Sequence, residues 1–349
     1  DKMIRIRIIG GQNRDTYDLD NPKKIVVYDF KTKTSEFQSD MEFKKLTDDY
    51  ETNIYNYKKL KYSKNQLIPS VGSNPDDGLR LGIKDTYTTY GFERNPFTSQ
   101  HFLGASYYFA TNGFDLSYKG EFAKVLGDWN LGIRSDFTSA NYSVNFFGYG
   151  NSTKNPNKED SDMFDLDYNR VKLSTFKVAP SLIWKGELGG QFEGSVVYES
   201  IEVEATEDRY INTFYVANGE ETTDNFLGTE VTYNFVNVDN RAFPTLGIHT
   251  DLTLGFKTNL DESNSFGYII PSIAFDYKLM QTGQLVLATK LKGHFNIGDG
   301  FEFYQAATLG ASDGLRGYRN QRFSGQRSFY QNIDLRLDLK RFKTALLPI

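Results

Sequence analysis

From Gly78 onward, hydrophobic and polar residues alternate with a period of two, which is typical of strands that have one apolar and one polar face. In the stretch 246–257 the even positions are Leu, Ile, Thr, Leu, Leu and Phe, whereas the odd positions are Gly, His, Asp, Thr, Gly and Lys. The same division recurs in 227–237, 267–279, 284–295 and 329–340. Across these five segments none of the 31 residues on the apolar face is charged, whereas 11 of the 29 residues on the opposite face are. The pattern predicts a chain built from strands.

Two all-β architectures alternate in this way, a soluble β-sandwich and a transmembrane β-barrel. Sandwich strands are typically ~5–6 residues long. The alternating segments here run about 10–14 residues, the length that a tilted strand needs to cross a membrane. Long polar connections at 150–165, 204–225 and 297–327 are interspersed with short turns, as in outer-membrane barrels. We therefore predict an all-β fold, a transmembrane antiparallel β-barrel.

Counting the segments in order predicts twelve strands. Their expected bounds are 78–88, 100–110, 114–124, 128–138, 141–149, 166–184, 189–203, 226–238, 246–258, 266–279, 284–296 and 328–341. In the sixth segment, Val171 and Leu173 share one parity, whereas the apolar residues from Val178 to Trp184 share the other. A switch of this kind predicts a β-bulge.

Residues 1–66 have a different pattern. The stretches 4–8 and 24–28 read as short strands, and 32–64 is polar and rich in lysine. We predict a small β connector and tether over 1–66, followed by the barrel over 67–349.

Composition removes several classes of function. The 349 residues contain no cysteine, which excludes disulfides, cysteine-ligated zinc and thiol catalysis within them. The net charge of −5 gives no reason to expect a nucleic-acid partner. Mean hydropathy is −0.53, and no apolar run approaches the ~18–20 residues of a membrane-spanning helix.

The long connection between the eleventh and twelfth segments contains Leu315-Arg316-Gly317-Tyr318, followed by Arg322-Phe323 and by Asp334-Leu335-Arg336. This arrangement resembles the BamA-type superfamily of outer-membrane proteins, also called the bacterial surface antigen family. There a Val/Ile/Leu-Arg-Gly-Phe/Tyr motif lies at the tip of the loop between the eleventh and twelfth strands. The stretch 69–82 is also similar to the start of the first strand in that family. The resemblance covers about residues 67–349.

The resemblance implies that this loop folds back into the lumen and that inward-facing polar groups hold Arg316 there. Asp334 and Asp338 are the candidate partners, since both lie on the polar face of the twelfth segment. It also implies a sixteen-stranded barrel of which the first twelve strands are present, so we expect the chain to be a fragment at both ends. The implied location is the outer membrane of a Gram-negative bacterium. The implied partners are outer-membrane lipid, lipopolysaccharide, and client or accessory outer-membrane proteins.

The N-terminal residues carry a second resemblance. Residues 10–17, Gly-Gly-Gln-Asn-Arg-Asp-Thr-Tyr, resemble one calcium-binding nonapeptide repeat, which makes Asp15 a weak calcium candidate. A single repeat cannot build stacked calcium sites, so a tight turn is favoured. The wider stretch 6–30 is similar to the connector in fused proteins that carry a metallophosphoesterase domain ahead of a BamA-type barrel. No stretch of 1–66 resembles a POTRA domain, the periplasmic module of true insertases.

Other candidate chemistry is weak. The acidic loop 159–167 makes Asp160 and Asp162 further calcium candidates, but it lacks the glycine of an EF-hand loop, so a solvated loop is favoured. Residues 310–314 fit the G-x-S-x-G pattern of serine hydrolases, which needs a later histidine. The last histidine, His294, precedes them. We predict no metal site, no cofactor and no enzymatic activity for these residues.

Three functions compete. In the first, the barrel inserts or translocates outer-membrane or surface proteins, as the resemblance implies. In the second, it anchors or exports a fused upstream enzyme related to the metallophosphoesterases. In the third, the least favoured, it is a diffusion porin.

Overall fold

The structure is a computed structural model. It describes residues 6–20, 22–38, 44–48, 50–53, 62–74, 78–91, 97–154, 165, 167–214 and 222–339. The chain divides into two compact units, Asp1–Lys64 with Thr88–Thr98, and Asn65–Tyr87 with Ser99–Ile349. None of the helices within the described residues has the length and hydrophobicity needed to cross a membrane.

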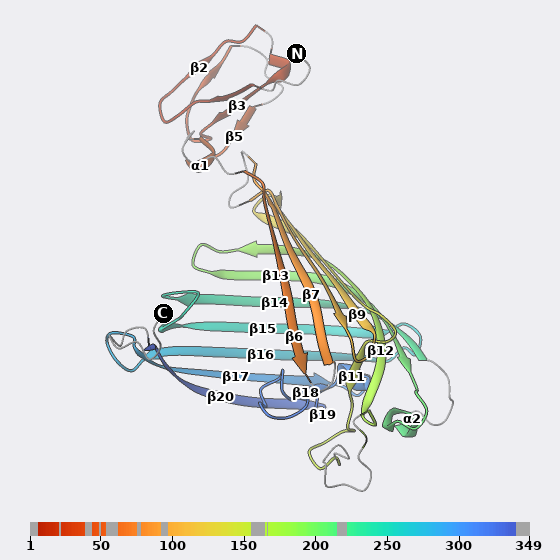
Figure 1. The fold of residues 1–349 in the computed structure, drawn as a ribbon. Coiled ribbons are helices and arrows are strands. Elements are labelled where there is room, and N and C mark those ends of the chain that lie inside the picture. The colour runs from red at the N-terminus through yellow and green to blue at the C-terminus, as the bar shows by residue number, and fades with distance from the viewer. Residues whose placement is uncertain are drawn as a thin grey trace. The chain divides into compact units, whose positions relative to one another are not determined.

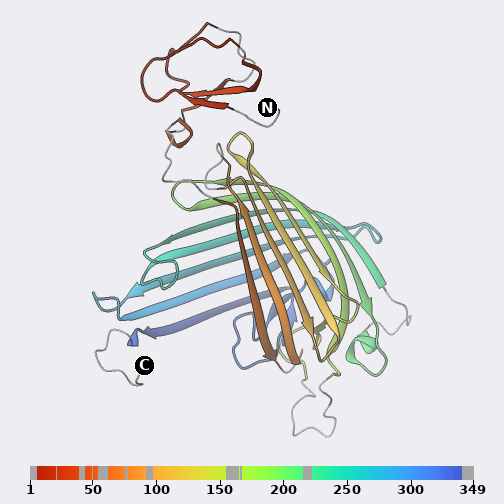
Figure 2. The ribbon, with the colours of Figure 1, turned by 45° about the horizontal axis from the view of Figure 1, so that its top comes forward.

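The second unit is one large antiparallel sheet in which each strand pairs with its neighbours in chain order. Figures 1 and 2 show the sheet curving around a concave interior. In order from one edge, its strands are β6 (Lys64–Asn74), β7 (Gly78–Thr89), β8 (Ser99–Tyr108), β9 (Gly113–Leu126), β10 (Trp129–Thr138), β12 (Arg170–Lys185), β13 (Gly190–Glu204), β14 (Thr222–Val238), β15 (Leu246–Asn259), β16 (Ser265–Lys278), β17 (Leu285–Ile297) and β20 (Arg327–Leu337). A short strand, β11 (Ser143–Asn145), pairs with β12 beside this path.

The prediction of twelve spanning strands contained two errors that cancel. The predicted fifth strand, 141–149, is wrong, since only the three residues of β11 pair there. Asn145, Phe146 and Phe147 are buried in succession, which a strand with one lipid-facing side does not allow. Conversely, β6 was not counted as a strand of its own, although 67–74 was assigned to the barrel and 69–82 was likened to the start of the first strand. An edge strand tolerates a proline, so β6 is the first strand and β20 remains the twelfth.

The predicted bulge in the sixth strand is also wrong. The register of β12 against β10 is constant from Asn130↔Ile183 to Thr138↔Thr175, and its printed pairs with β13 keep one register too. Val171 and Leu173 instead face inward and pack in a hydrophobic cluster, which explains their parity without a bulge. The register shift lies between β9 and β10, where Lys124 has a φ of 51°.

The two faces of the sheet differ as the alternation predicts. The register places Val231, Leu254 and Ile269 in one cross-strand row of the convex face, here called the outward face. On the concave, inward face, Lys257 is buried and bonds Glu199. Glu230 on the same face accepts hydrogen bonds from Arg134 at 3.1 Å and from the Tyr268 hydroxyl at 2.9 Å. The inward charges therefore compensate one another across strands, which leaves the outward face apolar.

Leu252 lies near the middle of β15, between Tyr233 and Pro271 on the outward face. We expect Leu252→Arg to cost about 2–4 kcal/mol of stability, because the guanidinium would face lipid at the bilayer centre. The measurement is the folded fraction in phospholipid vesicles, read by the gel shift of heated against unheated samples. Thr253→Arg places the same side chain on the inward face and is the matched control. Equal folded fractions for the two variants would contradict the assignment of the faces.

The first unit contains short parallel strands. β1 (Ile6–Ile9), β3 (Ile25–Asp29) and β5 (Lys44–Leu46) form one parallel sheet, and β2 (Thr16–Tyr17) pairs in parallel with β4 (Glu36–Phe37). Successive strands thus alternate between two sheets, as in the coils of a β-solenoid. The 3₁₀ turn η1 (Pro22–Lys24) and the short helix α1 (Tyr50–Asn53) complete the unit. Its core is formed by Tyr17 and Val27 with Ile8, Leu19 and Phe37 packed against them.

Candidate functional site: the loop between β17 and β20

The loop from Gly298 to Gln326 has its own structure. It contains a 3₁₀ turn, η3 (Phe303–Gln305), and a hairpin of β18 (Ala307–Leu309) with β19 (Phe323–Gly325). The tip of this hairpin, 310–322, carries the Leu-Arg-Gly-Tyr sequence. We call the whole segment the inner loop, because its contacts are with inward-facing residues.

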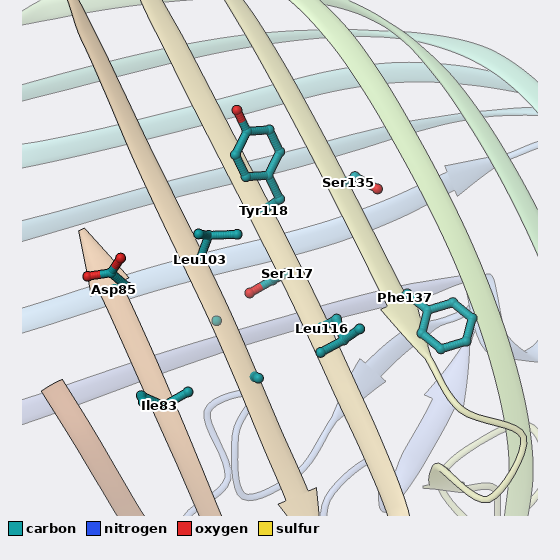
Figure 3. A pocket seen from close by; sticks show the side chains of 10 residues that line it. Ile83, Asp85, Leu103, Leu116, Ser117, Tyr118, Ser135 and Phe137 are labelled. Atoms are coloured by element: carbon teal, nitrogen blue, oxygen red, sulfur yellow. The ribbon is translucent and has the colours of Figure 1, made fainter. Parts of the chain in front are cut away.

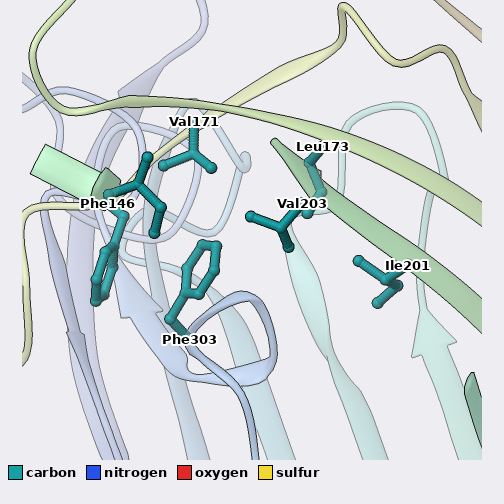
Figure 4. Packing of buried hydrophobic residues seen from close by; sticks show 7 residues of the cluster. Phe146, Val171, Leu173, Ile201, Val203 and Phe303 are labelled. Atoms are coloured by element: carbon teal, nitrogen blue, oxygen red, sulfur yellow. The ribbon is translucent and has the colours of Figure 1, made fainter. Parts of the chain in front are cut away.

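A hydrophobic cluster, here called the loop core, holds the base of the inner loop (Figure 4). Phe303 is 3% exposed, and its ring centroid lies 4.7 Å from that of Phe146. The remaining members of the loop core come from β12, β13 and the helix α2 (Tyr210–Phe214). The cluster therefore joins two strands to three loops: the inner loop, the loop after β10 and the loop after β13. The members of the loop core are Phe146, Val171, Leu173, Ile201, Val203, Ile211 and Phe303.

Polar contacts tie the inner loop to the segment that follows β10. The backbone N–H of Asn145 donates to Gln321 Oε1 at 3.0 Å, and the side-chain amide of Asn145 donates to the backbone carbonyl of Asn320 at 3.2 Å. Arg322 donates to Thr153 through both terminal nitrogens, at 2.7 Å to the hydroxyl and 2.6 Å to the carbonyl. The same guanidinium lies 4.8 Å from the ring centroid of Phe147. These bonds satisfy backbone groups that an inward-folded loop would otherwise leave unpaired.

The motif lies against the inward face of β20. Arg316 donates from both terminal nitrogens to the two carboxylate oxygens of Asp334, at 3.0 and 3.1 Å. Its side chain is 75% exposed, so this bidentate pair fixes the orientation of the guanidinium more than it adds stability. Of the two candidates, Asp334 is the partner with which the structure pairs Arg316. Asp338 donates its backbone N–H to Gln284.

Two glycines give the tip its shape. Gly314 and Gly317 both have a φ of +87°, which side-chain-bearing residues rarely adopt. A Cβ on Gly314 would lie 2.3 Å from the ring of Tyr330 on β20, so the backbone approaches the strand closely there. At Gly317 the surroundings are open and the conformation alone favours glycine. The ring of Tyr318 packs 5.6 Å, centroid to centroid, from that of Phe323, and Leu315 N–H donates to Gly310 at the start of the turn.

Asp15, the calcium candidate of the first unit, lies beside a side-chain cation. The ammonium of Lys33 lies 2.7 Å from Asp15 Oδ2 and 3.0 Å from Asp29 Oδ1. It also donates to the carbonyls of Gly10 and Gly11 at 3.1 and 3.3 Å. Among the described residues no group of three or more His, Asp or Glu side chains could hold a metal, and Asp160 and Asp162 lie outside those residues.

Burial works against the charge of Lys33, but the hydrogen bonds to Asp15 and Asp29 outweigh it and raise the pKa of the lysine. A Cβ on Gly10 would lie 2.0 Å from the Tyr17 hydroxyl, so close packing also accounts for this glycine. The repeat-like sequence therefore forms a turn around an internal ammonium ion.

Sequence reasoning missed Lys33 and the loop core. The lysine lies in a polar stretch with no distinguishing neighbour, and its partners are brought to it only by the coiling of the chain. The sequence Phe301-Glu302-Phe303-Tyr304 did contain a signal, since aromatic residues are unexpected in a solvated loop.

Comparison with known proteins places these features in a family. Residues 129–334, more than half of the chain, match the family model described as the Omp85 superfamily domain. The chain belongs to the Omp85 superfamily. A search of curated proteins gave no match. The family assignment confirms the resemblance found in the sequence, and with it the prediction of an all-β barrel fold.

A solved structure shares the fold of this Omp85 superfamily member. The crystal structure of BamA from Haemophilus ducreyi lacking POTRA domains 1–3 superposes with a TM-score of 0.54 at 16% sequence identity. The match covers 75% of this chain and 47% of the BamA chain, so the present chain spans about half the length of that protein.

Proposed function

We propose that this protein is an outer-membrane barrel of a Gram-negative bacterium that inserts or translocates other outer-membrane or surface proteins. The single observation that carries the proposal is the Omp85 superfamily domain over residues 129–334, with the superfamily's Arg-Gly-aromatic motif at the tip of an inward-folded loop. Its partners would be client or accessory outer-membrane proteins, with lipid and lipopolysaccharide around the barrel.

The first strand supports a mechanism of strand templating. β6 is an edge of the sheet within the described residues, and an edge strand offers unpaired N–H and C=O groups to an incoming strand. Pro69 lies in the middle of β6 and has no N–H, so β6 has one hydrogen-bond donor fewer along its length. The side chain of Val71 is 71% exposed on this strand. A seam that includes β6 would therefore be weak enough to open for a client strand.

The inner loop argues against a diffusion porin. Its base is buried in the loop core and its tip lies along the inward face of β20, so it occupies space through which solutes would have to pass. A porin instead leaves an aqueous channel.

Crosslinking tests the proposal directly, because the 349 residues contain no native cysteine. Val71→Cys places a thiol on the edge strand, and Leu254→Cys places one on the outward face of the central strand β15. The two variants would be incubated in vesicles with an unfolded small barrel protein that carries one cysteine in its terminal strand. We expect a disulfide with the client for Val71→Cys only. Equal crosslinking of the two variants, or none, would contradict templating at β6.

Arg316→Ala tests the contribution of the inner loop. The substitution removes both bonds to Asp334, so the tip should lose its fixed orientation against β20 while the loop core holds the base. Because the pair is exposed, its loss is expected to slow client assembly by about threefold, with the folded yield of the protein itself almost unchanged. The measurements are the rate of client folding in vesicles and the rate of protease cleavage within 310–322. Arg241→Ala, in the exposed turn between β14 and β15, is the control, and unchanged cleavage in Arg316→Ala would refute docking.

A second candidate function is an anchor or conduit for a fused enzyme. The observation that favours it is the first unit, whose described residues form parallel, solenoid-like strands and resemble the connector of metallophosphoesterase fusions. Hydrolysis of a phosphodiester probe by intact cells that carry the native protein would support this function. Normal client assembly without hydrolysis would exclude it in favour of the first.

A further inference from the structure

The outward face of β7–β10 carries a groove with a cavity volume of about 380 Å³ (Figure 3). Its walls include Ile83, Leu103, Leu116 and Phe137, all of which belong to the outward face. The groove is hollowed where small residues replace large ones, as at Ala105. No apolar side chain of the described residues fills it.

Of the four polar residues that line this groove, Asp85, Tyr118 and Ser135 lie toward one end, whereas Ser117 lies in the intermediate row, paired with Gly104, and has the parity of the inward face. Leu103, Tyr118 and Ser135 form a cross-strand row in the register of β8, β9 and β10, and Asp85 lines the groove with them. Figure 3 shows Asp85, Tyr118 and Ser135 toward one end and Ile83, Leu116 and Phe137 toward the other. The polar end is the one nearer the short turns 127–128 and 186–189, which in outer-membrane barrels face the periplasm.

One row closer to those turns, His101 pairs with Gly120. The ring nitrogens of His101 lie 2.9 Å from the Tyr118 hydroxyl and 3.1 Å from that of Ser99. A Cβ on Gly120 would lie 2.5 Å from the Tyr118 hydroxyl oxygen, so the tyrosine ring folds over the glycine. These contacts fix the polar end of the groove before any ligand arrives.

Among the residues that line the groove, Asp85 is unusual because it is the acidic one. It shares its parity with Leu79, Leu81 and Ile83 and is thus an acidic residue on the outward face. Its Oδ1 atom is enclosed and has no hydrogen-bond partner among the described residues. The apolar face of 227–340, by contrast, carries no charged residue in its alternating segments. A carboxylate that faces lipid needs a hydrogen-bond donor or a cation from outside the chain.

We propose that this groove binds a phospholipid with a primary ammonium headgroup, a phosphatidylethanolamine of the periplasmic leaflet. The order of groups fits an amphiphile in that leaflet, since the polar end faces the periplasm and the apolar walls lie toward the membrane centre. The ammonium group bonds Oδ2 of Asp85, since Oδ1 is enclosed by the protein. The Ser135 hydroxyl is available to the rest of the headgroup, and the acyl chains lie along Leu116 and Phe137. The proposal rests on the membrane placement of the proposed function and adds a lipid site to it.

The depth and charge of the site select this ligand. Asp85 is four residues from the end of β7, which places it ~10 Å below that end along the barrel axis for a strand tilted as in outer-membrane barrels. A headgroup that reaches this depth must be drawn there by a specific bond. Phosphatidylglycerol brings no cation, and its net negative charge would be repelled by Asp85.

Lipid retention measures the site. The protein would be exchanged into vesicles of equal parts phosphatidylethanolamine and phosphatidylglycerol, purified in mild detergent, and the retained lipids counted by native mass spectrometry. We expect the wild type to retain phosphatidylethanolamine about tenfold over phosphatidylglycerol, the factor that one hydrogen bond to a charged group gives. Asp85→Asn should abolish this preference, and it should fold normally because it removes an unpaired charge. Asp136→Asn, on the inward face of β10, is the matched control and should keep it.

Three results would overturn the proposal. The first is retention of the two lipids in equal amounts by the wild type, and the second is an unchanged preference in Asp85→Asn. The third is capture of a protein instead of lipid by a photocrosslinker at Ile83 in native membranes, which would assign the groove to a membrane-embedded partner. None of these results depends on client assembly, so failure here is distinguishable from failure of crosslinking at Val71.

Discussion

Lys33→Met is expected to destabilise the first unit by about 3–5 kcal/mol, because it removes one partner of a buried ion pair. The side chain of Lys33 is 8% exposed, and its ammonium lies within hydrogen-bonding distance of four oxygen atoms, from Gly10, Gly11, Asp15 and Asp29. Methionine keeps the length of the side chain but leaves the fully buried carboxylate of Asp29 without its cation. The measurement is hydrogen exchange across β1 and β3 in the whole protein. Lys31→Met, in the same exposed turn, is the control.

Calcium then tests the earlier hypothesis about Asp15. Calcium or EDTA should leave exchange in the wild type unchanged, because the ammonium of Lys33 already lies among these oxygens. In Lys33→Met the same oxygens are of the type that calcium prefers, so millimolar calcium should restore part of the protection. A calcium effect of equal size in the wild type would show that the ion binds at a site other than the one that the Lys33 ammonium occupies.

The ion pair also gives a pH dependence. The pKa of Lys33 is raised in the folded state, so its contribution is complete below the unfolded value near ~10.4 and is lost as the pH rises through the folded pKa. Burial works to raise the pKa of Asp29, but hydrogen bonds from Ser35, Lys33, the Phe30 N–H and Tyr17 outweigh it and lower the pKa overall. Its contribution is therefore present above an unfolded value near ~3.9 and is lost as the pH falls through the folded pKa. Protection of β3 should be greatest between these limits.

Phe303→Ala is expected to weaken the docking of the inner loop by about 3–5 kcal/mol, the usual cost of removing a buried phenylalanine ring. The ring belongs to the loop core and packs near Phe146. The other residues of the cluster include inward-facing ones at the start of β12 and at the end of β13. Its removal should expose 298–326 to protease, whereas the strands, held by their own ladders, should remain folded. The rate of cleavage in this segment, with the folded yield as reference, is the measurement.

The control for this loop is Tyr318→Ala, which removes an aromatic ring from the half-exposed tip and should change cleavage little. If Phe303→Ala leaves cleavage at the wild-type rate, the loop core does not hold the loop. If it lowers the yield of the barrel itself, the cluster is a folding nucleus for β12 and β13 as well as an anchor.

The all-β fold and the two faces of its strands were predictable from the alternation of residues alone. Alternation in β14–β17 and β20 is a local property of the backbone, because successive side chains of a strand point to opposite sides, and the observed register keeps the predicted apolar residues on one face. The position of the inner loop and its motif, between the eleventh and twelfth strands, was also predicted from the order of the segments. The count of twelve strands was right only because the false strand at 141–149 and the uncounted β6 cancel.

Tertiary structure alone decided what the inward-facing and loop residues do. Val171 and Leu173 break the alternation because Phe303, 130 residues away from Leu173 in sequence, buries them, and no local pattern contains that contact. Likewise, coiling of the first unit brings Lys33 to Asp15, and the packing of β7–β10 places Asp85 beside the small residues at which the groove is hollowed. A period of two shows which side of the sheet a residue takes, whereas its partner on that side depends on where the rest of the chain folds.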